Sequence, residues 1–172
     1  MIEVRALTPD ELRLATEIDV TEDGTVVLEQ RGTTLRSRPE EWHRPPRDAA
    51  AWREFEAQWR GFVPASGVAL GAFDGARLVG ISTLRRAIRP ELDQLEALFV
   101  DRAQRRRGVA SALVAGIEAL ARSGGARLLY VSATPSESAV GFYRSRGFAP
   151  AIEPIPELLA LEPDDIHMTL AL

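Results

Sequence analysis

Residues 92–121 place the strongest limits on the fold of this 172-residue chain. An apolar strand is predicted over 92–100, a basic turn follows, and an Ala- and Leu-rich helix is predicted over 109–121, closed by Gly124 and Gly125. A strand that passes through a turn into a helix is the repeating unit of α/β proteins. We therefore expect an α/β fold in which this strand belongs to a central sheet.

The rest of the chain continues this alternation. Strands are predicted over 2–7, 68–73, 77–85, 127–133 and 166–172, and helices over 9–18, 48–59 and 136–145. A hairpin around Arg31-Gly32 is expected within 25–38, followed by an irregular Pro-rich stretch, and a second Pro-rich linker is expected over 150–163. Leaving that first hairpin aside, the order β-α-α-β-β-β-α-β-α-β-β predicts one domain over 1–172, with a mixed central sheet flanked by helices.

Composition excludes several classes of protein. The chain has no Cys, which rules out disulfides, a Cys nucleophile and a thiolate metal site, and its two His residues have no metal-ligand spacing. A net charge of −4 disfavours nonspecific binding to nucleic acid. With no apolar run of 18 residues and no signal-peptide pattern, we expect a soluble, cytoplasmic protein without a membrane partner.

The turn between the predicted strand and helix is a candidate phosphate-binding site. At a helix start the first N–H groups are unpaired, and with the helix dipole they favour an anion, to which neighbouring arginines would add charge. The alternative is a solvated basic turn, since every basic residue of this chain is Arg. The candidate residues of this turn are Arg105, Arg106, Arg107, Gly108, Val109, Ala110 and Ser111.

A second motif lies one strand further on, with Ser136 at its start, Phe142-Tyr143 in a predicted helix, and Gly147-Phe148 after it. Together, in this order and spacing, the two motifs resemble those of the GNAT superfamily of acyl-CoA-dependent N-acetyltransferases. The resemblance covers about residues 68–150. The insertion between the first two helices, with its hairpin, resembles that of streptothricin-type acetyltransferases.

The resemblance implies a GNAT fold and acetyl-CoA as the acyl donor. Residues 105–111 would bind its pyrophosphate, and the backbone of Leu98, Phe99 and Val100 would bind its pantetheine arm beside a bulge that splays this strand from the next. Tyr143 matches the tyrosine that donates a proton to the departing CoA thiolate; the alternative is a packing role. Ser136 stands where the family often has an Asn that contacts the cofactor, and its shorter side chain puts that contact in doubt.

Attack by an amine needs a base, because an amine with a pKa near 10 is mostly protonated at neutral pH. Glu96 matches an acidic position of the family, and strand alternation predicts that Gln94, Glu96, Leu98 and Val100 share one face. The alternatives are a plain surface charge at Glu96, or another base. The other candidate bases are His43, in the Pro-rich stretch, and His167. The position of His167 in a terminal strand favours a structural role for it. Trp42 is a candidate for an acceptor pocket, whereas Trp52 and Trp59 have the spacing of core residues.

These observations predict an N-acetyltransferase that transfers acetyl directly, in a ternary complex, to an amine of a small molecule or peptide. Residues 20–65 and 150–165 would shape the acceptor site, and the cofactor motifs lie within 92–148. The alternative is a catalytically silent CoA-binding sensor or partner-binding module. The apolar C-terminal strand is also capable of pairing across a homodimer.

Overall fold

A seven-stranded mixed sheet forms the centre of the computed structural model, which describes residues 2–172. Its strand order is β1-β4-β5-β6-β7-β9-β8, and the pairing is antiparallel except between β6 and β7, which run parallel. The strands are β1 (Ile2–Ala6), β4 (Gly67–Asp74), β5 (Arg77–Arg89), β6 (Leu92–Val100), β7 (Leu128–Ala133), β8 (Ala149–Pro150) and β9 (Ile166–Ala171). The predicted α/β class with a mixed sheet is confirmed.

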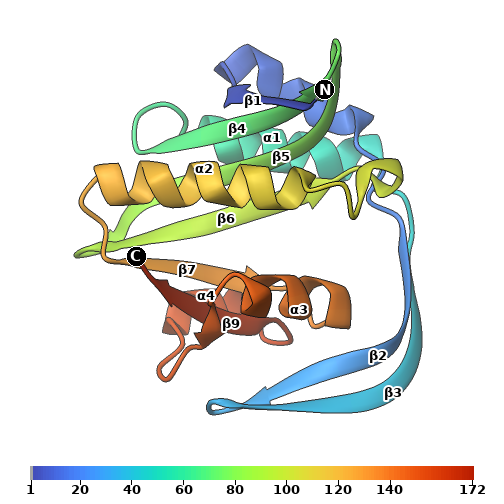
Figure 1. Cartoon of the computed structure of the whole chain (residues 1–172), viewed down its shortest axis with the longest axis vertical. Helices are drawn as coiled ribbons and strands as arrows, with labels where there is room; N and C mark the ends of the chain where they lie inside the picture. The colour runs from blue at the N-terminus through green and yellow to red at the C-terminus, as the bar shows by residue number, and fades with distance from the viewer. Residues whose placement is uncertain (1) are drawn as a thin grey trace.

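Helices cover both faces of this sheet, with α2 in front and α1 behind in the view of Figure 1. The α-helices are α1 (Ala49–Arg60), α2 (Val109–Ser123), α3 (Glu137–Ser145) and α4 (Pro156–Leu161), and the 3-10 segments are η1 (Pro9–Glu17) and η2 (Arg102–Gln104). Capping residues fix two of the starts: Asp48 accepts the N–H of Ala51 at α1, and Ser136 accepts that of Ala139 at α3.

The first predicted helix has a different type from the one expected. Residues 9–17 form a 3-10 helix, in which side chains three residues apart lie above one another. Leu12, Ala15 and Ile18 have this spacing and are all buried. The 3-10 form therefore brings all three to the core.

Two apolar cores lie on opposite faces of the sheet. One packs α2 against the sheet, with Leu113, Val114 and Ile117 fully buried. The other packs η1 and α1 against the opposite face and includes Trp52 and Trp59, both buried as predicted. Each of β4, β5 and β6 contributes to both cores, so these strands are fixed from both sides.

A long two-stranded hairpin stands apart from the main sheet. It comprises β2 (Glu22–Arg31) and β3 (Thr34–Arg44), and in Figure 1 it arches along one side of the molecule and passes beneath α3 and β9. The predicted turn is correct, but only residues 45–48 of the Pro-rich stretch are irregular. Its first part, up to Arg44, belongs to β3, where Pro39 pairs with Val26 next to a register shift. A ladder of two strands tolerates proline there because both strands are edges.

The second Pro-rich segment also holds more structure than predicted. Residues 150–163 include β8 and the short helix α4, which begins at Pro156. Proline suits the first helical position, since it has no N–H and its φ is already helical. The element order therefore gains this helix as well as the hairpin.

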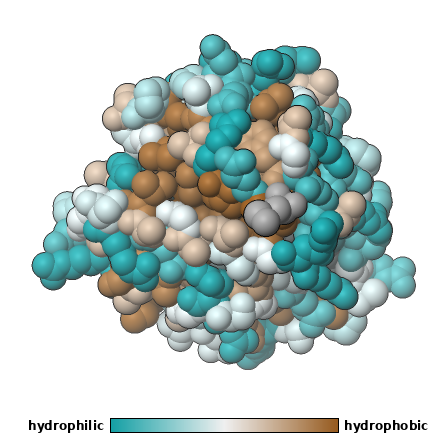
Figure 2. Space-filling view, turned by 45° about the horizontal axis from the view of Figure 1, so that its top comes forward, coloured by the Kyte–Doolittle hydropathy of each residue, from teal (hydrophilic) through white to brown (hydrophobic). Residues whose placement is uncertain are grey.

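The surface in Figure 2 is mixed in character: hydrophilic residues form most of the margin, and apolar residues gather toward the centre of the view. No helix in the described part of the chain is long and apolar enough to span a membrane.

Candidate active site

The sheet opens between β6 and β7. These strands pair only from Leu92–Gln94 to Leu128–Tyr130, and β6 continues to Val100 without a described partner on that side. A cavity of about 1110 Å³ occupies the opening. Its walls come from β6, the first turn of α2, the end of β7, α3, α1 and the segment that contains α4.

A β-bulge at Glu96 reorients the side chains of β6. Thr83 pairs with Ala97 and Leu84 with Leu95, so Glu96 is the extra residue on β6. Glu96 and Ala97 therefore both lie toward α1, while Leu98 and Val100 pack in the core beneath α2. The prediction that Glu96 shares a face with Leu98 and Val100 is wrong, because the bulge shifts the alternation by one residue.

The carboxylate of Glu96 is held by three donors. Gln58 Nε2 donates to Oε1 at 2.7 Å, while Trp59 Nε1 and Thr83 Oγ1 donate to Oε2 at 2.8 and 2.6 Å. Burial raises the pKa of Glu96, and the bonds from Thr83 and Trp59 oppose that rise. Glu96 also lines the cavity, so it combines a fixed orientation with a raised affinity for a proton.

The start of α2 forms a cradle at one end of the cavity. Arg106 and Gly108 both have positive φ, 61° and 83°, and the first bond into the helix runs from Ala112 N to Gly108 O. The helix therefore leaves the N–H groups of its first turn, residues 109–111, without helical partners, and these residues line the cavity. A Cβ at Gly108 would meet no atom within 4 Å, so the space in front of the turn is open. This arrangement fits an anionic group such as a pyrophosphate.

The three arginines of this turn point in different directions. Arg105 lines the cavity but donates to Val20 O at 3.3 Å and lies 3.8 Å from Glu22. Arg107 donates to Gln104 Oε1 at 2.6 Å and is not among the lining residues, whereas Arg106 is. Arg106 and the backbone of the turn are therefore the groups best placed for an anion.

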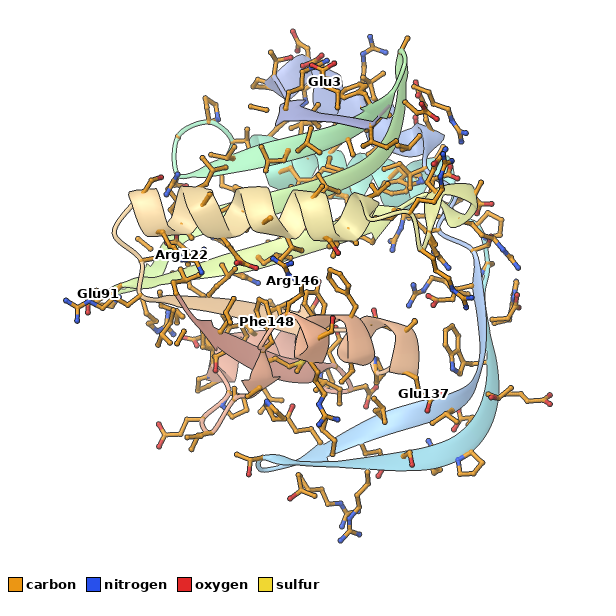
Figure 3. All side chains as sticks on the ribbon, viewed as in Figure 1. Glu3, Glu91, Arg122, Glu137, Arg146 and Phe148 are labelled. Carbon is orange, nitrogen blue, oxygen red and sulfur yellow. The ribbon has the colours of Figure 1, made fainter. Side chains whose placement is uncertain are left out.

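Tyr143 belongs to α3 and lines the cavity from the wall that this helix forms. Its side chain is buried, and its ring packs against Phe142 and Phe148 at centroid distances of 5.4 and 5.3 Å; Figure 3 labels Phe148. Burial, with the negative charge of Asp165, raises the pKa of Tyr143, so its hydroxyl holds its proton firmly. Leu98, Phe99 and Val100 line the cavity as well.

Ser136 lies outside this cavity lining. Its side chain is buried, and its hydroxyl caps α3 by accepting the N–H of Ala139 at 3.2 Å. Ser138, two residues on, does line the cavity and donates a hydrogen bond to Glu22 of the hairpin. Whether Ser136 contacts the cofactor stays a prediction.

Comparison with known proteins agrees with this geometry. The model of the acetyltransferase (GNAT) family matches residues 30–148. The chain belongs to the GNAT acetyltransferase family. Acetyl-CoA is therefore its acyl donor, and the cradle at the start of α2 fits the pyrophosphate of that molecule. A search of curated protein sequences found no match to the chain.

Solved structures share the fold. Nourseothricin acetyltransferase is 18% identical, with a TM-score of 0.76 over 99% of this chain and 98% of that one. A putative streptothricin acetyltransferase from Bacillus anthracis str. Ames, solved with acetyl coenzyme A, is 16% identical, with a TM-score of 0.77 over 100% and 99%. An aminoglycoside 6'-N-acetyltransferase complexed with coenzyme A is 18% identical, with a TM-score of 0.57 over 72% and 81%.

In this GNAT protein an ion pair joins α2 to the end of α3. Glu118 of α2 accepts from Arg146 at 2.8 Å and from Arg122 at 3.4 Å, and Figure 3 shows both arginines between α2 and the layer of β7 and α3. Glu118 is buried, so the pair is more than a surface contact. It links the two helices that contribute walls to the cavity.

The end of the cavity away from the cradle has walls from β3, α1 and the segment around α4; we call it the α1–α4 side. Burial and the charge of Glu162 raise the pKa of Asp165 to about 6. The residues that line the α1–α4 side are Arg44, Arg47, Phe55, Gln58, Leu158, Leu161, Glu162 and Asp165. This side therefore holds side chains of both charges around a few apolar groups.

A buried network holds α4 in place. The N–H of Ile155 donates to Tyr130 Oη, which lies 2.8 Å from His167 Nδ1, and His167 Nε2 lies 3.0 Å from the carbonyl of Glu162. A carbonyl only accepts, so Nε2 carries the proton and Nδ1 accepts from Tyr130. His167 therefore anchors both ends of α4, the structural role that its strand position favours.

The two remaining aromatic candidates lie on the hairpin. His43 pairs with Asp23 at 2.6 Å on an exposed part of it and does not line the main cavity. Trp42 donates to Val26 O and lines a separate cavity of about 360 Å³ with Glu22 and Asp23.

Sequence reasoning missed Gln58 and Thr83, two of the donors to Glu96, because only the folded sheet and α1 bring them to the carboxylate.

Proposed function

We propose that this protein, as a single N-acetyltransferase domain over 1–172, transfers acetyl from acetyl-CoA to an amine of a small molecule or peptide. The observation that carries the proposal is one continuous cavity that contains the cradle of α2, the carboxylate of Glu96 and the hydroxyl-bearing ring of Tyr143. These are the three functions that direct transfer needs: a site for the donor, a base and an acid.

The donor would be held along the opening of the sheet. In this proposal the backbone of 108–111 and the Arg106 guanidinium bind the pyrophosphate, and the free edge of β6 at Leu98, Phe99 and Val100 offers backbone groups to the pantetheine arm. When bound, acetyl-CoA supplies an acetyl group on a thioester. The roles predicted for Arg105, Arg107 and Ser136 stay predictions, since the side chains of the last two lie outside the cavity lining.

The two proton transfers would be divided between opposite walls. Glu96 Oε1 or Oε2, directly or through a water, accepts the proton of the amine as its nitrogen forms a bond to the acetyl carbon. As the carbon–sulfur bond breaks, Tyr143 Oη donates its proton to the sulfur. The raised pKa of Glu96 suits the role of base, because the carboxylate gains affinity for a proton. The raised pKa of Tyr143 keeps its hydroxyl protonated in the resting site but makes it a weaker proton donor, so donation depends on the thiolate charge that forms beside it.

Names of structural neighbours support nitrogen as the acceptor atom. The aminoglycoside enzyme and the ribosomal-protein-S18-alanine enzyme from Escherichia coli are both titled N-acetyltransferases. The fold is shared over 99% of this chain with the latter, at 16% identity and a TM-score of 0.65. The acceptor of this chain is open to any amine that fits the α1–α4 side.

The test is release of free CoA from acetyl-CoA in the presence of a panel of amines. Because the chain has no Cys, a thiol reagent reports CoA alone. We expect amine-dependent release that falls sharply in Glu96→Gln. Saturable binding of acetyl-CoA by thermal shift, without release for any amine, would favour the alternative of a silent CoA-binding module instead.

A further inference from the structure

Arg47 lies on the wall of the cavity, and within residues 2–172 its side chain has no ion pair. Its guanidinium carbon lies 4.4 Å from the ring centre of Phe55, 5.2 Å from that of Phe99 and 5.4 Å from that of Trp52. Its Nε is buried and, among residues 2–172, has no hydrogen-bond partner. The aromatic rings hold the side chain in position without neutralising its charge.

The charges around Arg47 do not compensate it. Burial and the positive charge of Arg44 lower the pKa of Arg47, and the charge of the neighbouring Asp48 opposes them with a smaller effect. Arg44 has a partner, Glu22 at 3.1 Å. Arg47 is half-buried, and a buried guanidinium nitrogen such as its Nε is costly without an acceptor. The planar set of donors of a guanidinium matches a carboxylate.

Arg47 lies at a fixed distance from the proposed base. Phe99 is three residues after Glu96 on β6, which corresponds to roughly 10 Å along a strand. The Phe55 ring beneath Arg47 also packs 5.4 Å from the ring of Trp59, whose Nε1 donates to Glu96. One aromatic cluster thus carries a cation at one end and the proton acceptor at the other.

Arg47 and the cradle lie on opposite sides of β6. Its partner rings belong to the core beneath α1, whereas the first turn of α2 packs in the core on the other face. The same cavity reaches both sides. Arg47 is therefore placed toward the acceptor and away from the phosphates of the donor.

We propose that Arg47 binds a carboxylate of the acceptor, so that the acceptor is an amine with a carboxylate several bonds from the reacting nitrogen. An amino acid with a long terminal amine, or a short peptide with a free C-terminus, has this chemistry. The inference rests on the proposed function and narrows it: polyamines and other acceptors without an anion leave Arg47 unpaired, and unpaired buried groups discriminate strongly between substrates.

The experiment compares matched acceptors that differ in the carboxylate alone: 6-aminohexanoate against hexylamine, and a dipeptide against its C-terminal amide. For the wild type we expect kcat/KM at least about tenfold higher for the carboxylate member of a pair, mainly through KM. Arg47→Gln should remove this preference and leave the KM for acetyl-CoA unchanged. Arg47→Lys should keep part of it, because a single ammonium cannot form two parallel bonds. Arg53→Gln, on an exposed position of α1, is the control for loss of one positive charge.

Three outcomes would overturn the inference: no preference in the wild type, an undiminished preference in Arg47→Gln, or a rise in the KM for acetyl-CoA in place of that for the acceptor. Binding of 6-aminohexanoate to Glu96→Gln, measured by calorimetry, separates the two proposals. Arg47-dependent binding without any turnover by the wild type contradicts the proposed function and leaves the carboxylate site standing.

Discussion

The indole nitrogen of Trp59 lies 2.8 Å from a carboxylate oxygen of Glu96 and donates a hydrogen bond to it. Trp59 is fully buried in the core that α1 forms with the sheet, so the bond ties the proposed base to the rigid part of the fold. The bulge in β6 allows the contact, because without it Glu96 would share the α2 face with Leu98 and Val100 and point away from Trp59. The geometry of the site thus depends on one inserted residue and one core tryptophan.

The bond from Thr83 to Glu96 sets the pH dependence of the proposed reaction. A donor to a carboxylate favours its charged form, so Thr83→Val should raise the pKa of Glu96 further. The acidic limb of the kcat/KM profile should then move to higher pH by about one to two pH units, since a bond to a charged group is worth about 1.5–3 kcal/mol. Ser82→Ala is the matched control: that neighbouring hydroxyl donates to Ala97 O instead. If both profiles coincide with that of the wild type, Glu96 is not the base.

Tyr143→Phe removes the proposed acid and keeps its ring contacts with Phe142 and Phe148. We expect kcat to fall by roughly 10–1000-fold, with a small change in the melting temperature. A thiolate is a tolerable leaving group, which favours the lower part of this range. Turnover at the wild-type rate would assign the protonation of sulfur to another group or to water.

Gly108→Ala tests the cradle at the start of α2. Its φ of 83° is unfavourable for alanine, at about 1–2 kcal/mol, and the added methyl group would project into open space in front of the turn. We expect the Kd for CoA in calorimetry to rise at least about tenfold through disturbed backbone donors. Gly75→Ala carries a similar strain, with φ of 62°, in the turn between β4 and β5. The Gly75→Ala variant should be less stable but should bind CoA with the wild-type Kd. An equal rise in the Kd for CoA in both variants would contradict the cradle.

Asp165 should make the protein less stable as pH rises from about 4 to 6. Its folded pKa is raised from 3.8 to about 6, so the native state binds more protons than the unfolded state in this window, and stability falls as pH increases. Asp165→Asn should therefore be more stable than the wild type at pH 7–8 and equal to it below about pH 4. Urea unfolding at several pH values measures both. A variant less stable at pH 7 would mean that Asp165 makes a favourable contact as a carboxylate.

The sequence predicted the elements whose signals are local. Helix α2 ends near two glycines, α1 begins at a capping Asp48, and the strand before α2 has a clear apolar pattern, so these were placed within a few residues. The turn before α2 was singled out as a candidate phosphate-binding site in the same way, because its glycine and arginines follow a strand and open a helix; the resemblance to the family then favoured a cofactor role, which stays a prediction. Local chemistry is sufficient for such features.

Features that depend on distant partners were not predictable. The family resemblance implied a bulge in this strand, but its place at Glu96 is set by the pairing of β6 with β5, so simple alternation wrongly placed Glu96 on the same face as Leu98 and Val100. Strand β3 continues through Pro39 because β2 pairs with it. Arg47 lies against aromatic rings because Phe99 of β6 packs against Phe55 of α1. In each case a contact between segments overrides the preference of a single segment.

The most direct test of the account follows acetyl-CoA labelled with carbon-13 in the acetyl group. After incubation with the amine acceptor, mass spectrometry of all products should find the label on the acceptor nitrogen, with an equal amount of free CoA. The double variant Glu96→Gln/Tyr143→Phe should form this product far more slowly, although it still binds CoA. Label that stays in acetyl-CoA, or that leaves as acetate at the same rate with and without amine, would contradict acetyl transfer to an amine at this site.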